Sequence, residues 1–227
     1  IEDLKSEFVN DYVFPMIQSS AIYEGTYLLG TSIARPLISK RQIEIAKKEK
    51  AFAVSHGSTG KGNDQVRFEL AYKALNPKIQ IISPWRIWNL KSREDCINYA
   101  KKNKIPISVT KKKPYSCDRN LYHISYEGGI LEDPWLEPPD EMYETVRPLI
   151  KTPNKPLKII LSFKNGIPIK LNNKTIKGVD LFKKLNPIAG KHGVGIVDIV
   201  ENRFVGMKSR GVYETPAGTV INIAHRA

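Results

Sequence analysis

The sequence predicts an α/β protein in which a parallel-sheet domain precedes an α+β domain. Between residues 41 and 110, apolar runs of strand length alternate with helical segments, which indicates parallel strands joined by crossover helices. Prolines then interrupt the chain between 134 and 156, and a hairpin pattern follows at 159–171. We therefore expect a domain boundary near residue 112, with domains over 1–112 and 113–227.

The first helices and strands follow from short patterns. Residues 1–14 have helical spacing of apolar side chains, and the charged segment 41–50 predicts a second helix. The apolar run 51–54 is a strand by its length, and a glycine-rich loop follows it. A strand at 79–83 comes after the next helix.

The helix between these two strands begins at Asn63 and Asp64, which we expect to supply its cap and its acidic first turn. Val66, Leu70 and Ala74 have the i, i+4, i+8 spacing of a buried stripe. We expect this stripe to pack against the sheet.

The remaining elements are a helix over 92–103 and an extended segment at 105–110. In the second domain, Asn165-Gly166 marks the turn of the hairpin. A helix over 179–191 and an extended run over 195–209 complete the α+β region.

The composition excludes several classes of protein. With 227 residues, 41% hydrophobic and 26% charged, the chain has the composition of a globular protein with a substantial core. No apolar run approaches the roughly 20 residues of a membrane-spanning helix, and no signal-peptide pattern opens the chain, so we expect a cytoplasmic protein. Cys96 and Cys117 are too few for a disulfide framework, and we expect both to be packing residues. With His56 and His123 they lack the usual spacing of zinc ligands, so no metal site is expected.

The net charge of +13 raises the question of nucleic acid binding. Lysines cluster at 101–104 and 111–113, but aromatic residues do not alternate with them. Lysines on solvated faces explain the charge more simply, and a positive field also suits small anionic substrates. We do not expect a nucleic acid partner.

The loop SHGSTGKGN at 55–63 combines glycines with a lysine, which suggests phosphate binding. Its spacing is not that of a Walker loop, since two residues separate Gly57 from Gly60 and a glycine follows Lys61. In parallel sheets ligands bind beyond the carboxyl ends of the strands, where this loop falls.

Asn63, Asp64 and Arg67 bring an amide, a carboxylate and a guanidinium to the mouth of this loop. Such a set is able to hold the charged ends of an amino acid. The alternative is a capped helix with an i, i+3 ion pair, although a simple cap does not require three glycines. Three other segments carry hydroxyls or charges: 23–36, 114–129 and 201–218.

Together these segments resemble the argininosuccinate synthase family. The resemblance is carried by SSAIYEGTYLLGTSIARP, VSHGSTGKGNDQVRFE, HISYEGGILEDP, AGKHGVG and DIVENRFVGMKSRGVYETPAGT, in the order of that family. It implies a Rossmann-like nucleotide-binding domain of the adenine nucleotide alpha hydrolase type, followed by a synthetase domain.

The resemblance also implies a reaction. Citrulline and aspartate are joined to argininosuccinate, in arginine biosynthesis and the urea cycle, while ATP is split to AMP and pyrophosphate. The citrulline ureido oxygen attacks the α-phosphorus to give a citrullyl-adenylate, and the aspartate amine then displaces AMP. ATP is used as its Mg²⁺ complex, and no protein nucleophile is required.

The site residues implied by the resemblance come from both domains. The implied ATP-binding residues are Ser55, His56, Gly57, Ser58, Thr59, Gly60, Lys61, Gly62 and Asn63. The implied aspartate-binding residues are Thr59, Asn63 and Asp64. The implied citrulline-binding residues are Tyr27, Ser32, Asn63, Arg67, Ser116, Ser125, Glu201 and Tyr213.

The family's Ser-Gly-Gly-Leu-Asp-Thr-Ser loop, which grips the pyrophosphate of ATP, does not occur in this sequence, nor does the C-terminal helix used in tetramer assembly. We therefore expect a fragment of a longer homotetrameric enzyme. Two alternatives stay open: a tRNA-modifying ATP-pyrophosphatase that adenylates a base, and a non-enzymatic basic module that binds RNA.

Overall fold

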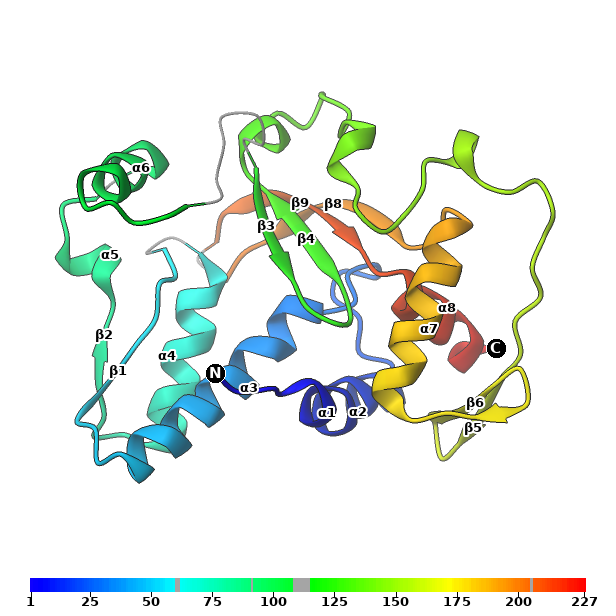
Figure 1. Ribbon diagram of the computed structural model, residues 1–227, viewed down its shortest axis with the longest axis horizontal. Coiled ribbons are helices and arrows are strands. Elements are labelled where there is room, and N and C mark those ends of the chain that lie inside the picture. Colours follow the sequence, from blue (N-terminus) through cyan, green and yellow to red (C-terminus); the bar gives the residue numbers. More distant parts are fainter. Residues whose placement is uncertain (60–61, 91, 108–114, 205) are drawn as a thin grey trace. The chain divides into compact units, whose positions relative to one another are not determined.

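The computed structural model describes residues 1–59, 62–90, 92–107, 115–204 and 206–227 (Figure 1). The chain divides into two compact units. The larger unit comprises residues 1–34, 115–202 and 208–227, and the smaller unit comprises residues 35–114 and 203–207. The predicted boundary at residue 112 stays a prediction, because units defined by contacts need not coincide with domains.

The smaller unit contains the predicted alternation of strands and helices. Its elements are α3 (Gly30–Lys48, from Arg35 onward), β1 (Ala53–Ser55), α4 (Asn63–Leu75), β2 (Gln80–Ile82), α5 (Pro84–Ile87) and α6 (Arg93–Lys102). Strands β1 and β2 pair in parallel, with Ala53 opposite Gln80. This pairing confirms the parallel strands that the sequence predicts.

The buried face of α4 differs from the predicted one. The core of the smaller unit consists of Ile43, Ala46, Val54, Tyr72 and Ile79, with Phe68 and Ile81 packed against it. Leu70 is 63% exposed, so the predicted stripe of Val66, Leu70 and Ala74 is wrong. Phe68 and Tyr72 have the same i, i+4 spacing, and their rings bury more apolar surface than the aliphatic stripe.

Helix α6 confirms the predicted helix over 92–103. Ser92 caps it, since its Oγ accepts a hydrogen bond from the Asp95 amide at 3.1 Å and the Ser92 amide donates to Asp95 Oδ2 at 2.9 Å. Residues 105–107 have no regular structure. The rest of the predicted extended segment, 108–110, and the lysines at 111–113 lie outside the described residues.

The larger unit begins with a helix of three parts and ends with a single helix. Its elements are α1 (Lys5–Glu7), a π-helical turn (Phe8–Val13), α2 (Phe14–Gln18), the first turns of α3, β3 (Ser116–Arg119), β4 (Ile124–Glu127), three 3₁₀ turns (Gly129–Glu132, Asp140–Met142 and Leu149–Lys151), β5 (Leu161–Lys164), β6 (Ile167–Leu171), β7 (Lys174–Thr175), α7 (Gly178–Lys191), β8 (Ile196–Asn202), β9 (Lys208–Glu214) and α8 (Pro216–Arg226). Figure 1 shows α7 and α8 side by side.

The main sheet of the larger unit has the strand order β3-β4-β9-β8, and all its pairs are antiparallel. The predicted extended run 195–209 is therefore not one strand. It is divided between β8, which ends at Asn202, and β9, which begins at Lys208, and Gly206 between them has a φ of +81°. Cys117 lies on the exposed strand β3, so the prediction that it is a packing residue is wrong.

The second sheet of the larger unit is the predicted hairpin, with β5 and β6 antiparallel and β7 added beside β6. Asn165 and Gly166 have φ values of 51° and 76°, which are the left-handed values that a two-residue hairpin turn requires. Within the described residues, no helix is long and apolar enough to cross a membrane.

Candidate functional site

Four of the predicted citrulline contacts come together in the larger unit. The rings of Tyr27 and Tyr213 stack with their centroids 4.4 Å apart, and Tyr213 Oη donates to Glu201 Oε1 at 3.0 Å. Ser125 lies opposite Tyr213 across the β4–β9 pair, so both side chains are on one face of the sheet. Tyr27, Ser125, Glu201 and Tyr213 are each at most 6% exposed. We call these four residues the tyrosine cluster.

Two glycines leave space for the ring of Tyr213 in this cluster and for the adjacent ring of His123. A Cβ added at Gly211 would lie 2.5 Å from Tyr213 Oη, so the Tyr213 ring extends along β9 over a residue without a side chain. Immediately before β4, His123 stacks against Tyr213 at 6.0 Å. A Cβ at Gly30 would lie 2.5 Å from the His123 ring, so this histidine also depends on a glycine.

A tight turn positions Tyr27. The amide of Tyr23 donates to the Tyr27 carbonyl at 2.9 Å, and the amide of Tyr27 donates back at 3.0 Å. Tyr23 Oη donates to the Asn202 carbonyl at 2.7 Å, which ties this turn to the end of β8. The cluster is therefore held by hydrogen bonds at its edge as well as by stacking.

Burial raises the pKa of Tyr213, and the negative charge of Glu201 raises it further. The phenol consequently stays protonated and remains a hydrogen-bond donor at neutral pH. A buried carboxylate beside phenol and serine hydroxyls suits the ammonium and polar groups of an amino acid.

Four predicted citrulline contacts are not members of this cluster: Asn63 and Arg67 belong to the smaller unit, and Ser32 and Ser116 to the larger unit. Ser32 is the third residue of α3 and is half-buried, and Ser116 is the exposed first residue of β3, opposite Glu127. Their predicted roles stay predictions.

The glycine-rich loop lies where the sequence places it, between the end of β1 and the start of α4. Ser55 Oγ donates to the Ile82 carbonyl at 2.9 Å, which links the ends of the two parallel strands. The space around Gly57 is open, because an added Cβ would meet nothing within 4 Å. Gly60 and Lys61, two predicted ATP contacts, lie outside the described residues.

His56 is buried at the base of this loop and uses both ring nitrogens. Nδ1 accepts a hydrogen bond from the Ser58 amide at 3.2 Å, so the proton lies on Nε2, which is 3.2 Å from Glu69 Oε1. Arg86 also contacts Glu69. Partial burial raises the pKa of Glu69, but the hydrogen bonds from Arg86 and His56 outweigh that effect and lower it. His56 therefore holds the loop at Ser58.

Asn63 does not cap α4, contrary to expectation. The cap position is Gly62, and no side chain caps the helix. Asn63 Oδ1 instead accepts a hydrogen bond from the Phe204 amide at 2.8 Å, which orients the side-chain amide. Thr59 precedes the helix, and its carbonyl accepts from the Gly62 amide at 3.4 Å.

Asp64 is held between two arginines. Arg67 Nη1 donates to its Oδ1 at 2.8 Å, which confirms the predicted i, i+3 pair. Arg35 Nε and Nη2 lie 2.8 and 2.7 Å from its Oδ2. The two arginines and the carboxylate together carry one net positive charge.

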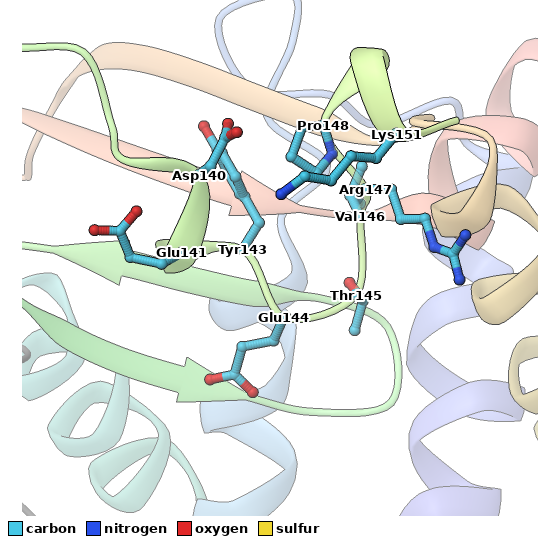
Figure 2. A pocket seen from close by; sticks show the side chains of 9 residues that line it. All are labelled: Asp140, Glu141, Tyr143, Glu144, Thr145, Val146, Arg147, Pro148 and Lys151. Atoms are coloured by element: carbon cyan, nitrogen blue, oxygen red, sulfur yellow. The ribbon is translucent and has the colours of Figure 1, made fainter. Parts of the chain in front are cut away.

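A cavity of about 400 Å³ lies elsewhere in the larger unit (Figure 2). It is lined by Asp140, Glu141, Tyr143, Glu144, Thr145, Val146, Arg147, Pro148 and Lys151, none of which the sequence predicts as a site residue. Figure 2 shows Asp140 and Glu141 on one side of the cavity and Arg147 on the other. Among the described residues, no group of three acidic, histidine or cysteine side chains is arranged to hold a metal ion.

The segment that lines this cavity is held by the buried carboxylate of Glu214. Its Oε2 accepts from the amides of Thr145 and Val146 at 2.7 and 2.6 Å, and from Thr145 Oγ1 at 2.7 Å. Its Oε1 accepts from Tyr126 Oη at 2.6 Å and from the Glu144 amide at 2.8 Å. Glu214 is 0% exposed and has five donors, so its charge is fully compensated by hydrogen bonds.

Comparison with known proteins decides the family. The model of the arginosuccinate synthase N-terminal HUP domain matches residues 1–106, and that of the arginosuccinate synthase C-terminal domain matches residues 115–227. The chain belongs to the argininosuccinate synthase family. The N-terminal match also confirms the predicted Rossmann-like fold class.

Similarity along the whole of this chain to members of the argininosuccinate synthase family agrees with these matches. Proteins named argininosuccinate synthase are 63% identical in Caldanaerobacter subterraneus subsp. tengcongensis, 60% in Carboxydothermus hydrogenoformans and 61% in Geobacter sulfurreducens. Each match covers 100% of this chain and 55% or 56% of the relative. The chain thus spans little more than half the length of these relatives.

The sequence alone did not predict several residues that shape the tyrosine cluster, the start of α4 and the segment that lines the cavity. Gly30 and Gly211 carried a usable signal, since a glycine inside a regular segment often marks a close approach. Arg35 carried no local signal, because its partner Asp64 lies 29 residues away. Glu214 likewise acquires its role from donors 68 or more residues earlier.

Proposed function

We propose that this chain contributes to the ATP-dependent ligation of citrulline and aspartate to argininosuccinate, with release of AMP and pyrophosphate. The observation that carries the proposal is the tyrosine cluster, which joins four predicted citrulline contacts from three separate segments of the chain. The family relationship supports it, since the relatives cited above carry the name of this enzyme.

The tyrosine cluster supplies the groups that citrulline needs. The Glu201 carboxylate accepts hydrogen bonds from an ammonium group, and the Tyr27 and Ser125 hydroxyls orient a polar chain. Adenylation of the ureido oxygen depends on positioning rather than on a protein nucleophile. Rigid rings stacked in a buried layer are suited to that task.

The loop after β1 supplies the nucleotide side of the proposal. Open space at Gly57 lets the backbone approach a phosphate or the adenosine. The hydrogen bond from the Ser58 amide to His56 Nδ1 supports the first part of the loop. MgATP is the substrate, so the metal ion arrives with the nucleotide and the described residues need not hold it.

At the start of α4 we assign Thr59, Asn63 and Asp64 to aspartate, and Asn63 and Arg67 also to citrulline. The predicted citrulline contacts thus belong to both units. We further propose a cytoplasmic homotetramer as the working state of the full-length protein, as the family resemblance implies.

The proposal is tested by exchange of labelled pyrophosphate into ATP with magnesium, in the full-length gene product. We expect exchange that requires citrulline. Glu201→Gln removes the charge of the cluster but keeps its size, and should weaken citrulline roughly ten- to hundredfold, the usual effect of losing a hydrogen bond to a charged group.

Glu137→Gln is the matched control, since Glu137 is an exposed glutamate of the same unit. It should leave the exchange unchanged. A folded full-length protein without citrulline-dependent exchange would overturn the proposal, and equal effects of the two substitutions would remove the tyrosine cluster from it.

A further inference from the structure

Arg35 is not among the residues that the family resemblance assigns to a substrate, yet it contacts Asp64 twice. Its Nε and Nη2 both lie within 2.8 Å of Asp64 Oδ2. Arg67 uses only the other oxygen, Oδ1, at 2.8 Å. Each carboxylate oxygen therefore has its own arginine.

The net charge of Arg35, Asp64 and Arg67 determines which kind of ligand group they can bind. One carboxylate between two guanidinium groups leaves a surplus of one positive charge. The side chains of Arg35, Asp64 and Arg67 are 17%, 24% and 25% exposed, so solvent screens the surplus only in part. Without Arg35, Asp64 and Arg67 would form a neutral pair, and Arg67 would have little charge left for an anionic group.

The contacts also require arginine at this position. The Arg35 guanidinium lies over the Phe68 ring, 5.9 Å from its centroid, on the buried face of α4. A planar guanidinium stacks on a ring while donating two hydrogen bonds to one partner, whereas an ammonium group is a compact point charge. Lysine would keep the charge and lose the geometry.

We propose that Arg35 is a positioning residue for amino-acid recognition at the start of α4. It holds the Asp64 carboxylate and neutralises it, which leaves the charge of Arg67 available to the carboxylate of a bound amino acid. This inference rests on the proposed function for the identity of that amino acid, citrulline. A merely structural Arg35 would tie α3 to α4 and do nothing else.

The experiment compares Arg35→Lys and Arg35→Gln with Arg41→Lys in the full-length gene product. Arg41 is the matched control, since it lies on the same helix and pairs with Glu44 at 3.2 Å. We expect the KM for citrulline in pyrophosphate exchange to rise roughly ten- to hundredfold in both Arg35 variants, because two charge-assisted hydrogen bonds are lost. The kcat should stay within about threefold and the Tm of Arg35→Lys near that of the parent.

A second substitution separates charge from structure. Adding Asp64→Asn to Arg35→Gln removes the carboxylate that would neutralise Arg67. Citrulline affinity should recover in this double variant, although aspartate affinity should not. No recovery, an unchanged KM, or losses that follow the Tm alone would overturn the positioning role.

Calorimetric titration of citrulline distinguishes this outcome from failure of the proposed function. If the parent binds citrulline without exchange, the proposed reaction is wrong, and the affinities of the variants still decide the role of Arg35. If the parent neither binds citrulline nor catalyses exchange, both proposals are wrong.

Discussion

The tyrosine cluster and the start of α4 hold polar side chains in different ways. The cluster positions them by shape: its members are at most 6% exposed, two rings are stacked, and glycines leave space for ring edges. The start of α4 positions them by charge, with Arg35, Asp64 and Arg67 between 17% and 25% exposed. The closely packed cluster leaves no space for an added atom. The partly exposed ion pairs accept substitutions more easily, but their strength depends on the charged partners and on the salt concentration.

The largest effect should come from a buried charge on the same strand as Tyr213. In Glu214→Gln, one carboxylate oxygen becomes an amide nitrogen that faces backbone donors instead of accepting from them. We expect a loss of roughly 3 kcal/mol in the free energy of unfolding, since buried donors lose their acceptor. Chemical denaturation measures it.

The exposed Glu137→Gln serves as the control here too and should change stability by less than about 0.5 kcal/mol. If Glu214→Gln were equally mild, the carboxylate would not be what holds the 144–146 segment.

A smaller effect should distinguish the tyrosine cluster from the glycine-rich loop that precedes α4. Gly211→Ala places a Cβ 2.5 Å from Tyr213 Oη, and the ring is stacked on Tyr27 and His123, so it has little room to move. We expect a destabilisation of about 1 to 3 kcal/mol from overpacking. The same change at Gly57, where an added Cβ meets nothing within 4 Å, should cost less than about 0.5 kcal/mol.

Thermal unfolding of the two alanine variants provides the measurement. Equal shifts in Tm would contradict the contrast between a region held by shape and an open loop. A large effect at Gly57 would instead show that its backbone conformation is constrained.

The smallest effect should come from substitutions that each remove one of the two hydrogen bonds of the His56 ring. Asparagine places an acceptor near the position of Nδ1 and keeps the Ser58 contact, while glutamine places a donor near Nε2 and keeps the Glu69 contact. Each variant should lose about 1 kcal/mol, the net value of one hydrogen bond. Only His56→Gln should also weaken ATP binding, since it releases the loop at Ser58.

Titration of ATP into both variants of the full-length gene product measures the difference. Tighter or unchanged ATP binding in His56→Gln would exclude a role of the ring in shaping the loop.

Local patterns predicted much of the fold, and distant contacts explain the rest. The turn at Asn165-Gly166 and the parallel pair β1 and β2 follow from a few neighbouring residues. The division of 195–209 into two strands was missed, because no Asn-Gly pair marks a turn within it. The buried face of α4 was missed because two stripes share one spacing and only packing chooses between them.

The candidate site shows the same limit. The Asp64–Arg67 pair lies within one turn of a helix and was predictable. Stacking of Tyr27 on Tyr213 joins residues that are distant in sequence, so the family resemblance indicated both but nothing local paired them. Arg35 was invisible for the same reason.

The order of strands in the main sheet affects how the chain can fold while it is being synthesised. Strand β9 lies between β4 and β8, and Glu214 at its end bonds to Tyr126, 88 residues earlier. At about 5 to 20 residues per second, a ribosome needs roughly 4 to 18 s to make the intervening chain. Throughout that interval one edge of β4 lacks its partner strand. A chain that is still being synthesised must therefore keep this edge from pairing with other chains until β9 emerges.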